Sequence, residues 1–175
     1  MRYQKIIIVG SPGSGKSYLS KELEKITGLP VTHLDNLYWN PGWVETPKEE
    51  WINKQKEVIK EDRWIIDGNY NSTLEMRVQA ADLVLFLDMS RITCIYRVCR
   101  RHGKKRSDLP EFLDEKIDKE FWIFLKWIWD YPKRNHNSLL ELSKKYPDKK
   151  FIRLKNKKDI SLFLEKFTHQ GGKKK

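Results

Sequence analysis

The sequence predicts a single α/β domain built on a parallel sheet with helices on both faces, and three observations support this prediction. Short apolar runs, typical of buried strands, alternate along the chain with segments of helical periodicity. A glycine-rich stretch at residues 10–17 lies between the first such run and the first helix. The 175 residues suit one domain with a substantial core, and no linker or internal repeat divides them. We therefore expect residues 1–170 to form the domain and residues 171–175, which end in three lysines, to form a disordered tail.

The first predicted elements flank the glycine-rich stretch. Residues 5–9 are β-branched and apolar on both faces, as in a central parallel strand covered by helices. The helix expected at 16–27 ends at Gly28, since glycine commonly terminates helices. A short strand at 31–34 then brings Asp35 to its carboxyl end.

An aromatic loop at 37–43 leads into the middle of the chain. After it, Thr46-Pro47-Lys48-Glu49 forms a capping box with proline at the first helical position, so we expect a helix to begin there. Its buried face is predicted to carry Trp51, Ile52, Val58 and Ile59. The next predicted elements are a strand at 63–66, a short helix at 73–80 and a strand at 82–87.

Two helices dominate the prediction for the second half. The helix at 91–102 has Ile92, Ile95, Tyr96 and Cys99 on one side and basic residues on the other. A longer helix is expected from about 111 to 131, where Pro132 ends it. Its segment 121–129 is apolar nearly all round, so we expect burial on most sides, in the core or at a dimer face. The last predicted elements are a helix at 138–145, a strand at 150–154 and a helix at 158–167.

The composition is typical of a soluble protein. The apolar fraction is 39% and the charged fraction 34%, and the N-terminal apolar run is too short for a signal peptide, so we expect a cytoplasmic location and no membrane association. Cys94 and Cys99 point to different faces of a predicted helix and are expected to remain unpaired. The net charge of +11 suits either a nucleic-acid binder or an enzyme that collects phosphates.

The strongest functional signal is the stretch after the first strand, because it satisfies G-x-x-x-x-G-K-[ST] at the start of a helix. It consists of Gly10, Ser11, Pro12, Gly13, Ser14, Gly15, Lys16 and Ser17. In such a P-loop the backbone N–H groups wrap the phosphates of ATP, Lys16 reaches the β- and γ-phosphates, and Ser17 ligates Mg²⁺. We extend the predicted nucleotide contacts to Tyr18. The alternative is a plain glycine-rich turn, which rarely has the required strand and helix on its two sides.

Two acidic residues at predicted strand ends are candidates for the chemistry. Asp67 follows an apolar strand, where a P-loop protein places the carboxylate that holds Mg²⁺; the alternative is an Asp-Gly turn with Gly68. Asp35 lies at the same carboxyl edge and could accept a proton from an acceptor hydroxyl or orient it; the alternative is capping of a turn or helix. His33 alternates with Leu34 and receives no functional assignment.

Basic and aromatic residues extend the candidate site. Arg97, Arg100 and Arg101 share one face of a predicted helix, and guanidinium groups stabilise the charge of a transferring phosphoryl group. The alternative is a solvated basic face. Trp39 and Trp43 could stack on the ring of an acceptor, or they could close the core beneath their loop.

A combination of segments gives a more specific indication than the P-loop alone. Residues 10–17, residues 34–43 with their aromatic loop, residues 64–70 ending in Asp-Gly-Asn-Tyr, and a segment from Asp118 to Arg134 closely resemble adenylate-kinase-like proteins of the DNA topology modulation protein family. The resemblance covers nearly the whole chain. It implies the nucleoside monophosphate kinase fold, with a five-stranded parallel sheet in the order 2-3-1-4-5.

The same resemblance implies that different segments of the domain bind the acceptor, the phosphates and the adenine. It places an acceptor-binding region at about 35–62 and a small lid at about 97–116 that includes Arg97 and Arg101, and it puts Lys155 beside the adenine. Adenylate kinases have a Phe-Pro-Arg segment that helps hold the monophosphate, and this chain has Asn69-Tyr70-Asn71 there. Arg77 could supply the missing positive charge; the alternative is an ordinary residue on a helix surface.

These observations lead to a primary hypothesis and two alternatives. The first is a phosphotransferase that moves the γ-phosphate of ATP to a small-molecule acceptor, a nucleoside or nucleotide among the candidates, with Lys16, Asp35, Arg97 and Arg101 as working residues. The second is a nucleic-acid-associated ATPase or regulator that influences DNA topology, although the chain shows no recognition module and we expect only weak, unspecific binding of nucleic acid. The third is a nucleotide-binding protein without catalysis. The protein is expected to be a monomer or a homodimer.

Overall fold

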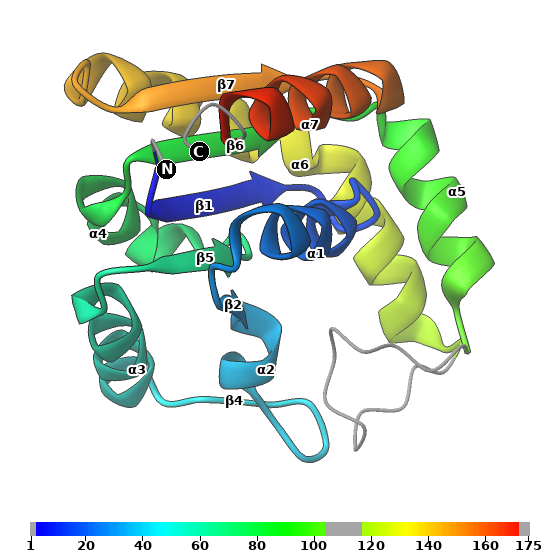
Figure 1. Ribbon diagram of the computed structural model, residues 1–175. Coiled ribbons are helices and arrows are strands. Elements are labelled where there is room, and N and C mark those ends of the chain that lie inside the picture. The colour runs from blue at the N-terminus through cyan, green and yellow to red at the C-terminus, as the bar shows by residue number, and fades with distance from the viewer. Residues whose placement is uncertain (1–2, 104–116, 172–175) are drawn as a thin grey trace.

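A five-stranded parallel sheet forms the centre of the computed structural model, which describes residues 3–103 and 117–171 (Figure 1). Its strand order is β2-β5-β1-β6-β7, and every neighbouring pair is parallel. Numbered among themselves, the five strands have the predicted order 2-3-1-4-5, so this prediction is confirmed. The strands are β1 (Lys5–Gly10), β2 (Val31–His33), β5 (Trp64–Asp67), β6 (Leu83–Leu87) and β7 (Lys150–Leu154).

Helices cover both faces of the sheet (Figure 1). The helices in the described ranges are α1 (Lys16–Thr27), α2 (Leu34–Tyr38), α3 (Lys48–Lys60), α4 (Asn71–Ala80), α5 (Arg91–Arg101), α6 (Lys119–Lys145) and α7 (Lys157–Gly171). Helices α1 and α7 pack on one face, while α3, α4 and the second half of α6 pack on the other. None of the helices in these ranges combines the length and the apolarity that crossing a bilayer requires.

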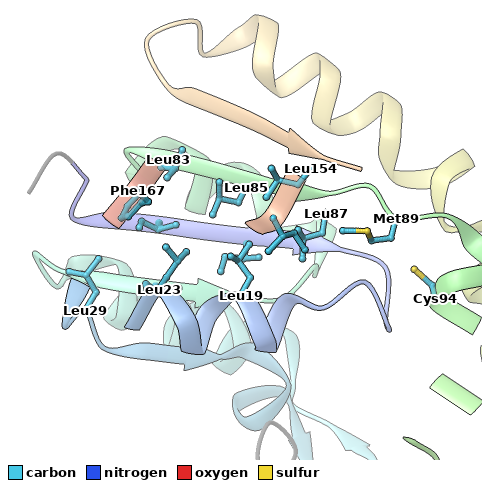
Figure 2. Close-up of a cluster of buried hydrophobic side chains, with 14 of the residues drawn as sticks. Leu19, Leu23, Leu29, Leu83, Leu85, Leu87, Met89, Cys94, Leu154 and Phe167 are labelled. Carbon is cyan, nitrogen blue, oxygen red and sulfur yellow. The ribbon is translucent and has the colours of Figure 1, made fainter. Parts of the chain in front are cut away.

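Strict alternation along the central strands explains why their sequences are apolar throughout. In β1, Ile6 and Ile8 join the core cluster on the α1 side, whereas Ile7 and Val9 join the cluster on the opposite face. Figure 2 shows Leu83 and Leu85 of β6 gathered with residues of α1 in the first of these clusters. Both faces of the sheet are therefore closed to water, and polar side chains can reach it only at its edges.

Pro132 does not end a helix, so the prediction of two separate helices in this region is wrong. Helix α6 runs through Pro132 to Lys145. A proline inside a helix removes one backbone hydrogen bond and costs about 3 kcal/mol. Here the buried residues Ile128 and Tyr131 before the proline and Asn135 and Leu139 after it anchor one continuous face. This shared burial keeps the helix intact across the proline.

The aromatic segment of α6 is also less buried than expected. Trp122 is 65% exposed, Ile123 is 52% exposed and Trp129 is 47% exposed. The reason is that α6 begins beyond the carboxyl edge of the sheet, where only the side that carries Ile128 meets the core (Figure 1). The predicted start of this helix at residue 111 lies outside the described residues, and the described helix begins after the capping residue Asp118.

Helix α5 does not bury the whole of its apolar side. Cys94 and Val98 are buried, whereas Ile92 is 72% exposed and Tyr96 is 61% exposed. The helix is turned so that Cys94 packs against the glycine-rich loop, and this contact between distant segments outweighs the apolar stripe. Cys94 and Cys99 do lie on different faces, one buried and one exposed, and both are free thiols.

The aromatic loop is more regular than predicted, and the capping box is not formed. Residues 34–38 are helical, and a small hairpin follows, with strands β3 (Trp39–Asn40) and β4 (Val44–Glu45). The Thr46 hydroxyl lies 2.7 Å from the Tyr38 carbonyl and closes this hairpin, so it is not available as a helix cap. Pro47 takes the cap position of α3 instead, and Trp51 is buried as predicted.

Candidate functional site

The glycine-rich loop after β1 forms a tight turn that rests on α5. Gly13 and Gly15 have φ angles of 79° and 102°, which L-residues with side chains rarely adopt. A Cβ atom at Gly13 would collide with the backbone carbonyl of Cys94. Glycine is therefore required here for two reasons, the backbone conformation and the close approach of α5.

Lys16 folds back over this loop from the first turn of α1. Its Nζ donates hydrogen bonds to the carbonyl of Gly10 at 3.0 Å and to that of Ser11 at 3.3 Å. Ser14 is fully buried, and its hydroxyl has no hydrogen-bond partner in the part of the chain that the structure describes. The loop thus presents one cation and the start of α1, an arrangement that suits an anionic ligand.

Asp67 lies beside the start of α1, held by residues from two elements. Only 5% of Asp67 is exposed, and its Oδ2 lies 3.3 Å from the Ser20 hydroxyl and 3.0 Å from Nδ1 of His33. An ionised carboxylate only accepts hydrogen bonds, so Nδ1 of His33 carries the proton. The Ser20 hydroxyl is also 3.1 Å from the Ser17 carbonyl, which links Asp67 to the P-loop helix.

The residues at this point fit a magnesium ion. Mg²⁺ prefers oxygen ligands and keeps several waters, so it needs only one or two protein groups together with the phosphates of the nucleotide. Ser17 supplies a hydroxyl, and Asp67 supplies a carboxylate whose Oδ2 is held by His33 Nδ1 and lies 3.3 Å from the Ser20 hydroxyl. No group of three metal-ligating side chains of the His, Cys, Asp or Glu type occurs within residues 3–103 and 117–171.

Asp35 is paired with a tyrosine from the neighbouring strand end. The Tyr70 hydroxyl donates a hydrogen bond of 2.7 Å to Asp35 Oδ1. Burial, and then the nearby Asp35 carboxylate, raise the pKa of Tyr70 far above its usual range, so the phenol keeps its proton. Asp35 lies in the first turn of α2, one residue beyond the predicted strand end.

Arg77 is neither on a helix surface nor available to an acceptor, so both interpretations from the sequence are corrected. It is fully buried, and its guanidinium donates to the carbonyls of Gly68, Asn69 and Tyr70. Burial lowers the pKa of Arg77 to about 9, which leaves it protonated at neutral pH. Arg77 therefore fixes the segment that carries Tyr70, whose φ of 40° is unusual for a residue with a side chain.

Arg97 lies on the P-loop itself. Its Nη1 donates to the carbonyls of Gly13 at 3.3 Å and Ser14 at 3.2 Å. Arg101, one turn further along α5, is half-buried, and Arg100 is exposed. The structure thus separates the predicted basic stripe into one residue on the loop, one that is half-buried and one that is exposed. Residues 104–116, which make up most of the predicted lid, lie outside the described residues.

The aromatic residues form a continuous row from the core to the surface. Trp51 is buried against Tyr38 and Tyr70, with ring centroids 4.9 Å and 4.7 Å away. Trp39 packs edge-on against Tyr38, and Trp43, which is 38% exposed, packs on Trp39. The inner members close the core beneath α2, and the two tryptophans of the hairpin form the outer end.

Two further residues that were predicted to contact the nucleotide have exposed side chains. Tyr18 is 58% exposed on α1. Lys155 follows β7, the outermost strand on its side of the sheet, and its side chain is exposed. Its backbone N–H donates to Asp159 at 2.8 Å, which fixes the turn into α7. Both side chains are exposed, and their contacts with a nucleotide remain predictions.

Two residues of the site were missed by the sequence argument. His33 holds Asp67, and Asn69 joins the P-loop to α6 because its Oδ1 accepts from the Gly10 N–H and from the Tyr131 hydroxyl, both at 2.9 Å. The register of β2 against β5, which pairs His33 with Asp67, is the signal that could have found the first. The contact made by Asn69 spans 62 residues and had no local signal.

Comparisons with known proteins agree with this geometry. No family model matches the chain. An adenylate kinase from Encephalitozoon cuniculi (strain GB-M1) is 26% identical over 141 residues, which are 69% of this chain and 76% of that protein. This chain is similar to an adenylate kinase. The comparisons do not show the DNA topology modulation protein family.

Solved structures support the fold. A shikimate kinase from Bacteroides thetaiotaomicron superimposes with a TM-score of 0.54 and 14% identity, covering 96% of this chain and 98% of that one. A deoxyadenosine kinase from M. mycoides with bound dATP gives a TM-score of 0.49 and 20% identity, covering 94% and 98%. At such low identities the first likeness shows a shared fold alone, and the second is too weak to add to it. The chain has the P-loop kinase fold that was predicted.

Proposed function

We propose that this protein is a phosphotransferase that uses Mg²⁺ and ATP and moves the γ-phosphate to a small-molecule acceptor. The observation that carries the proposal is the convergence of three groups at the carboxyl edge of the sheet. Lys16 lies over the P-loop, Asp67 lies against the start of α1, and Asp35 follows the neighbouring strand β2. The similarity to an adenylate kinase supports the same class of reaction.

Each residue has a separate task in this proposal. The P-loop N–H groups and Lys16 bind the phosphates, and Lys16 exchanges its two carbonyl partners for phosphate oxygens. Ser17 and Asp67 hold Mg²⁺, which neutralises charge on the β- and γ-phosphates when bound. Arg97 and Arg101 stabilise the transferring group from the side of α5. Asp35 accepts the proton of the acceptor hydroxyl or orients that hydroxyl.

Several finer parts of the proposal rest on the sequence. The acceptor-binding region at about 35–62 contains α2, the hairpin and α3. We retain a lid at about 97–116 as part of the proposal, with Arg97 and Arg101 at its start. Lys155 is proposed to border the adenine from the turn after β7. The nucleic-acid-associated alternative has no support from the comparisons.

The test is a measurement of ADP release from ATP in the presence of Mg²⁺ and single candidate acceptors. We expect one class of small molecule to raise ADP release well above the rate with water, and mass spectrometry should find that molecule phosphorylated. Lys16→Ala should abolish the stimulation, whereas the matched variant Lys25→Ala, at an exposed position of the same helix, should retain it. Stimulation by DNA alone, with no phosphorylated small molecule, would contradict the proposal.

A further inference from the structure

The acceptor side of the site carries a negative charge close to the strand ends. The Tyr70 hydroxyl donates a hydrogen bond to one oxygen of Asp35. Among residues 3–103 and 117–171, no other side chain is hydrogen-bonded to this carboxylate. A neutral tyrosine does not cancel the charge of its partner. A phosphate monoester placed against Asp35 would therefore face like-charge repulsion, while an alcohol hydroxyl could donate a hydrogen bond to it.

Two of the cations on this side of the site are already engaged. Arg77 is fully buried and donates to three backbone carbonyls. Lys54 of α3 donates to the Leu37 carbonyl at 3.3 Å and is paired with Glu50 at 2.8 Å. These contacts hold α2 and the segment after β5 in place. These two cations therefore serve the structure, whereas the Asp35 carboxylate remains available for recognition.

A third cation, on α6, is held by its own helix. The Arg134 guanidinium donates to the Trp127 carbonyl and lies over the Trp127 ring, 4.8 Å from its centroid. The carbonyl it binds lies in the turn before Pro132 of the same helix. Arg134 is thus engaged by its own helix.

The neighbouring surface is aromatic. Trp39 and Trp43 of the hairpin form the outer end of the row of rings that begins at Tyr70, so the Asp35 carboxylate and exposed tryptophan surface belong to one cluster. Indole rings offer flat apolar area for stacking on a planar group. A hydroxyl group and a flat ring are thus the two features that this side of the site can recognise.

Resting on the proposed function, we propose that the acceptor is an uncharged hydroxyl compound with a planar ring, of the nucleoside or aromatic-alcohol type, and not a phosphate monoester. In the transfer, the acceptor oxygen forms a bond to the γ-phosphorus of ATP. The bond between that phosphorus and the oxygen bridging to the β-phosphate breaks, and ADP leaves with its electrons. The hydroxyl proton passes to Asp35 and from there to water.

The experiment compares matched pairs of acceptors that differ only in a phosphate group. ADP release is measured with Mg²⁺-ATP and either a nucleoside or its 5′-monophosphate, for each common base, and with aromatic alcohols beside their phosphate monoesters. We expect kcat/KM for the uncharged member of the preferred pair to exceed that of its monoester by about a hundredfold or more, since like-charge contacts cost several kcal/mol. A monoester that is the better substrate overturns the inference while leaving the proposed function standing. No phosphorylated product with either class overturns the inference.

A variant separates the charge of Asp35 from the shape of the site. Asp35→Asn should lower kcat with the uncharged acceptor by about 10²- to 10⁴-fold, because the proton acceptor is lost. It should also improve inhibition by the matching monoester by about tenfold, because the repulsion is lost. Asp62→Asn, on an exposed turn, is the matched control and should change neither value. Should Asp35→Asn fail to fold in thermal unfolding, the acceptor pairs with the unaltered protein still decide the question.

Discussion

The side-chain oxygen of Asn69 accepts a hydrogen bond of 2.9 Å from the backbone N–H of Gly10, the first residue of the P-loop. The same oxygen accepts a second one, also of 2.9 Å, from the Tyr131 hydroxyl on α6. Gly10 is buried, so its N–H must find a partner inside the protein. One amide oxygen therefore connects the nucleotide loop, the end of β5 and α6.

Removing this oxygen should damage both stability and nucleotide binding. We expect Asn69→Ala to lower the free energy of unfolding by about 1–3 kcal/mol, because a buried N–H and a buried hydroxyl lose their acceptor. ATP affinity should also fall, since the start of the P-loop is no longer fixed. Urea denaturation and calorimetry measure the two effects. Asn69→Asp keeps an acceptor oxygen and should retain most of the stability; an equal loss in both variants would show that the oxygen is not what matters.

The pairing of Asp67 with the start of α1 predicts a metal-dependent effect. Asp67→Asn should weaken ATP binding in the presence of Mg²⁺ by at least about tenfold and change it little in the presence of a chelator, because only the metal contact needs the full carboxylate charge. Calorimetric titrations under both conditions measure this difference. Asp62→Asn is a suitable control, since Asp62 is exposed and remote from the loop. Equal weakening with and without Mg²⁺ would mean that Asp67 serves the structure alone.

The contact between α4 and the end of α6 should contribute to stability in a pH-dependent way. Glu75 accepts hydrogen bonds from Lys145 at 2.6 Å and from Tyr146 at 2.7 Å, and these bonds, that of Lys145 first, lower the pKa of Glu75 below its ordinary value of 4.5. Because the pKa is lower in the folded protein, the stabilisation is fully present above about pH 4.5 and is lost as the pH falls through the folded value.

Urea midpoints at neutral and acidic pH test this expectation. At pH 7 the midpoint of Glu75→Gln should lie below that of the unaltered protein, and the difference should shrink at pH 3.5. Glu141→Gln removes an exposed carboxylate from the same surface between α4 and α6 and should show no such convergence. A difference that stays constant with pH would contradict a role for the charge of Glu75.

Much of the fold and the P-loop could be predicted from local motifs. Contacts between segments that are distant in the sequence could not be predicted. The P-loop and the apolar strands are contiguous in the sequence, so their patterns could be interpreted directly. His33 was left aside because strand alternation was extended to Leu34. The strand ends at His33, and Leu34 already belongs to α2, so the register against β5 and not alternation decides where the imidazole lies.

The positions of Arg77 and Pro132 also depend on packing that local sequence patterns do not show. A lone arginine on a short helix predicts a surface position, because burying its charge is costly. It is buried here because three carbonyls after β5 converge on it, and such a cluster cannot be recognised in a linear sequence. Proline predicts the end of a helix from local rules, yet burial of Tyr131 and Asn135 on either side of it maintains the helix.

The position of Arg97 on the P-loop leads to a prediction about catalysis. Its guanidinium donates to the carbonyls of Gly13 and Ser14, which are uncharged partners, and charged phosphate oxygens form stronger hydrogen bonds with arginine. We therefore expect Arg97 to leave these carbonyls when ATP binds and to contact the transferring phosphoryl group.

Kinetics of Arg97→Ala should show a loss that falls mainly on kcat, by about 10²- to 10³-fold, since the contact to the phosphoryl group strengthens as charge develops in the transition state. The KM for ATP should change much less, because Lys16 and the loop N–H groups remain. Arg100→Ala is the matched control, since Arg100 lies three residues away on α5 but is exposed, and it should behave like the unaltered protein.

Arg97→Lys should recover only part of the rate, because an ammonium group cannot form the paired hydrogen bonds of a guanidinium. If Arg97→Ala and Arg100→Ala gave the same small effect, Arg97 would be a support of the loop with no part in the transfer.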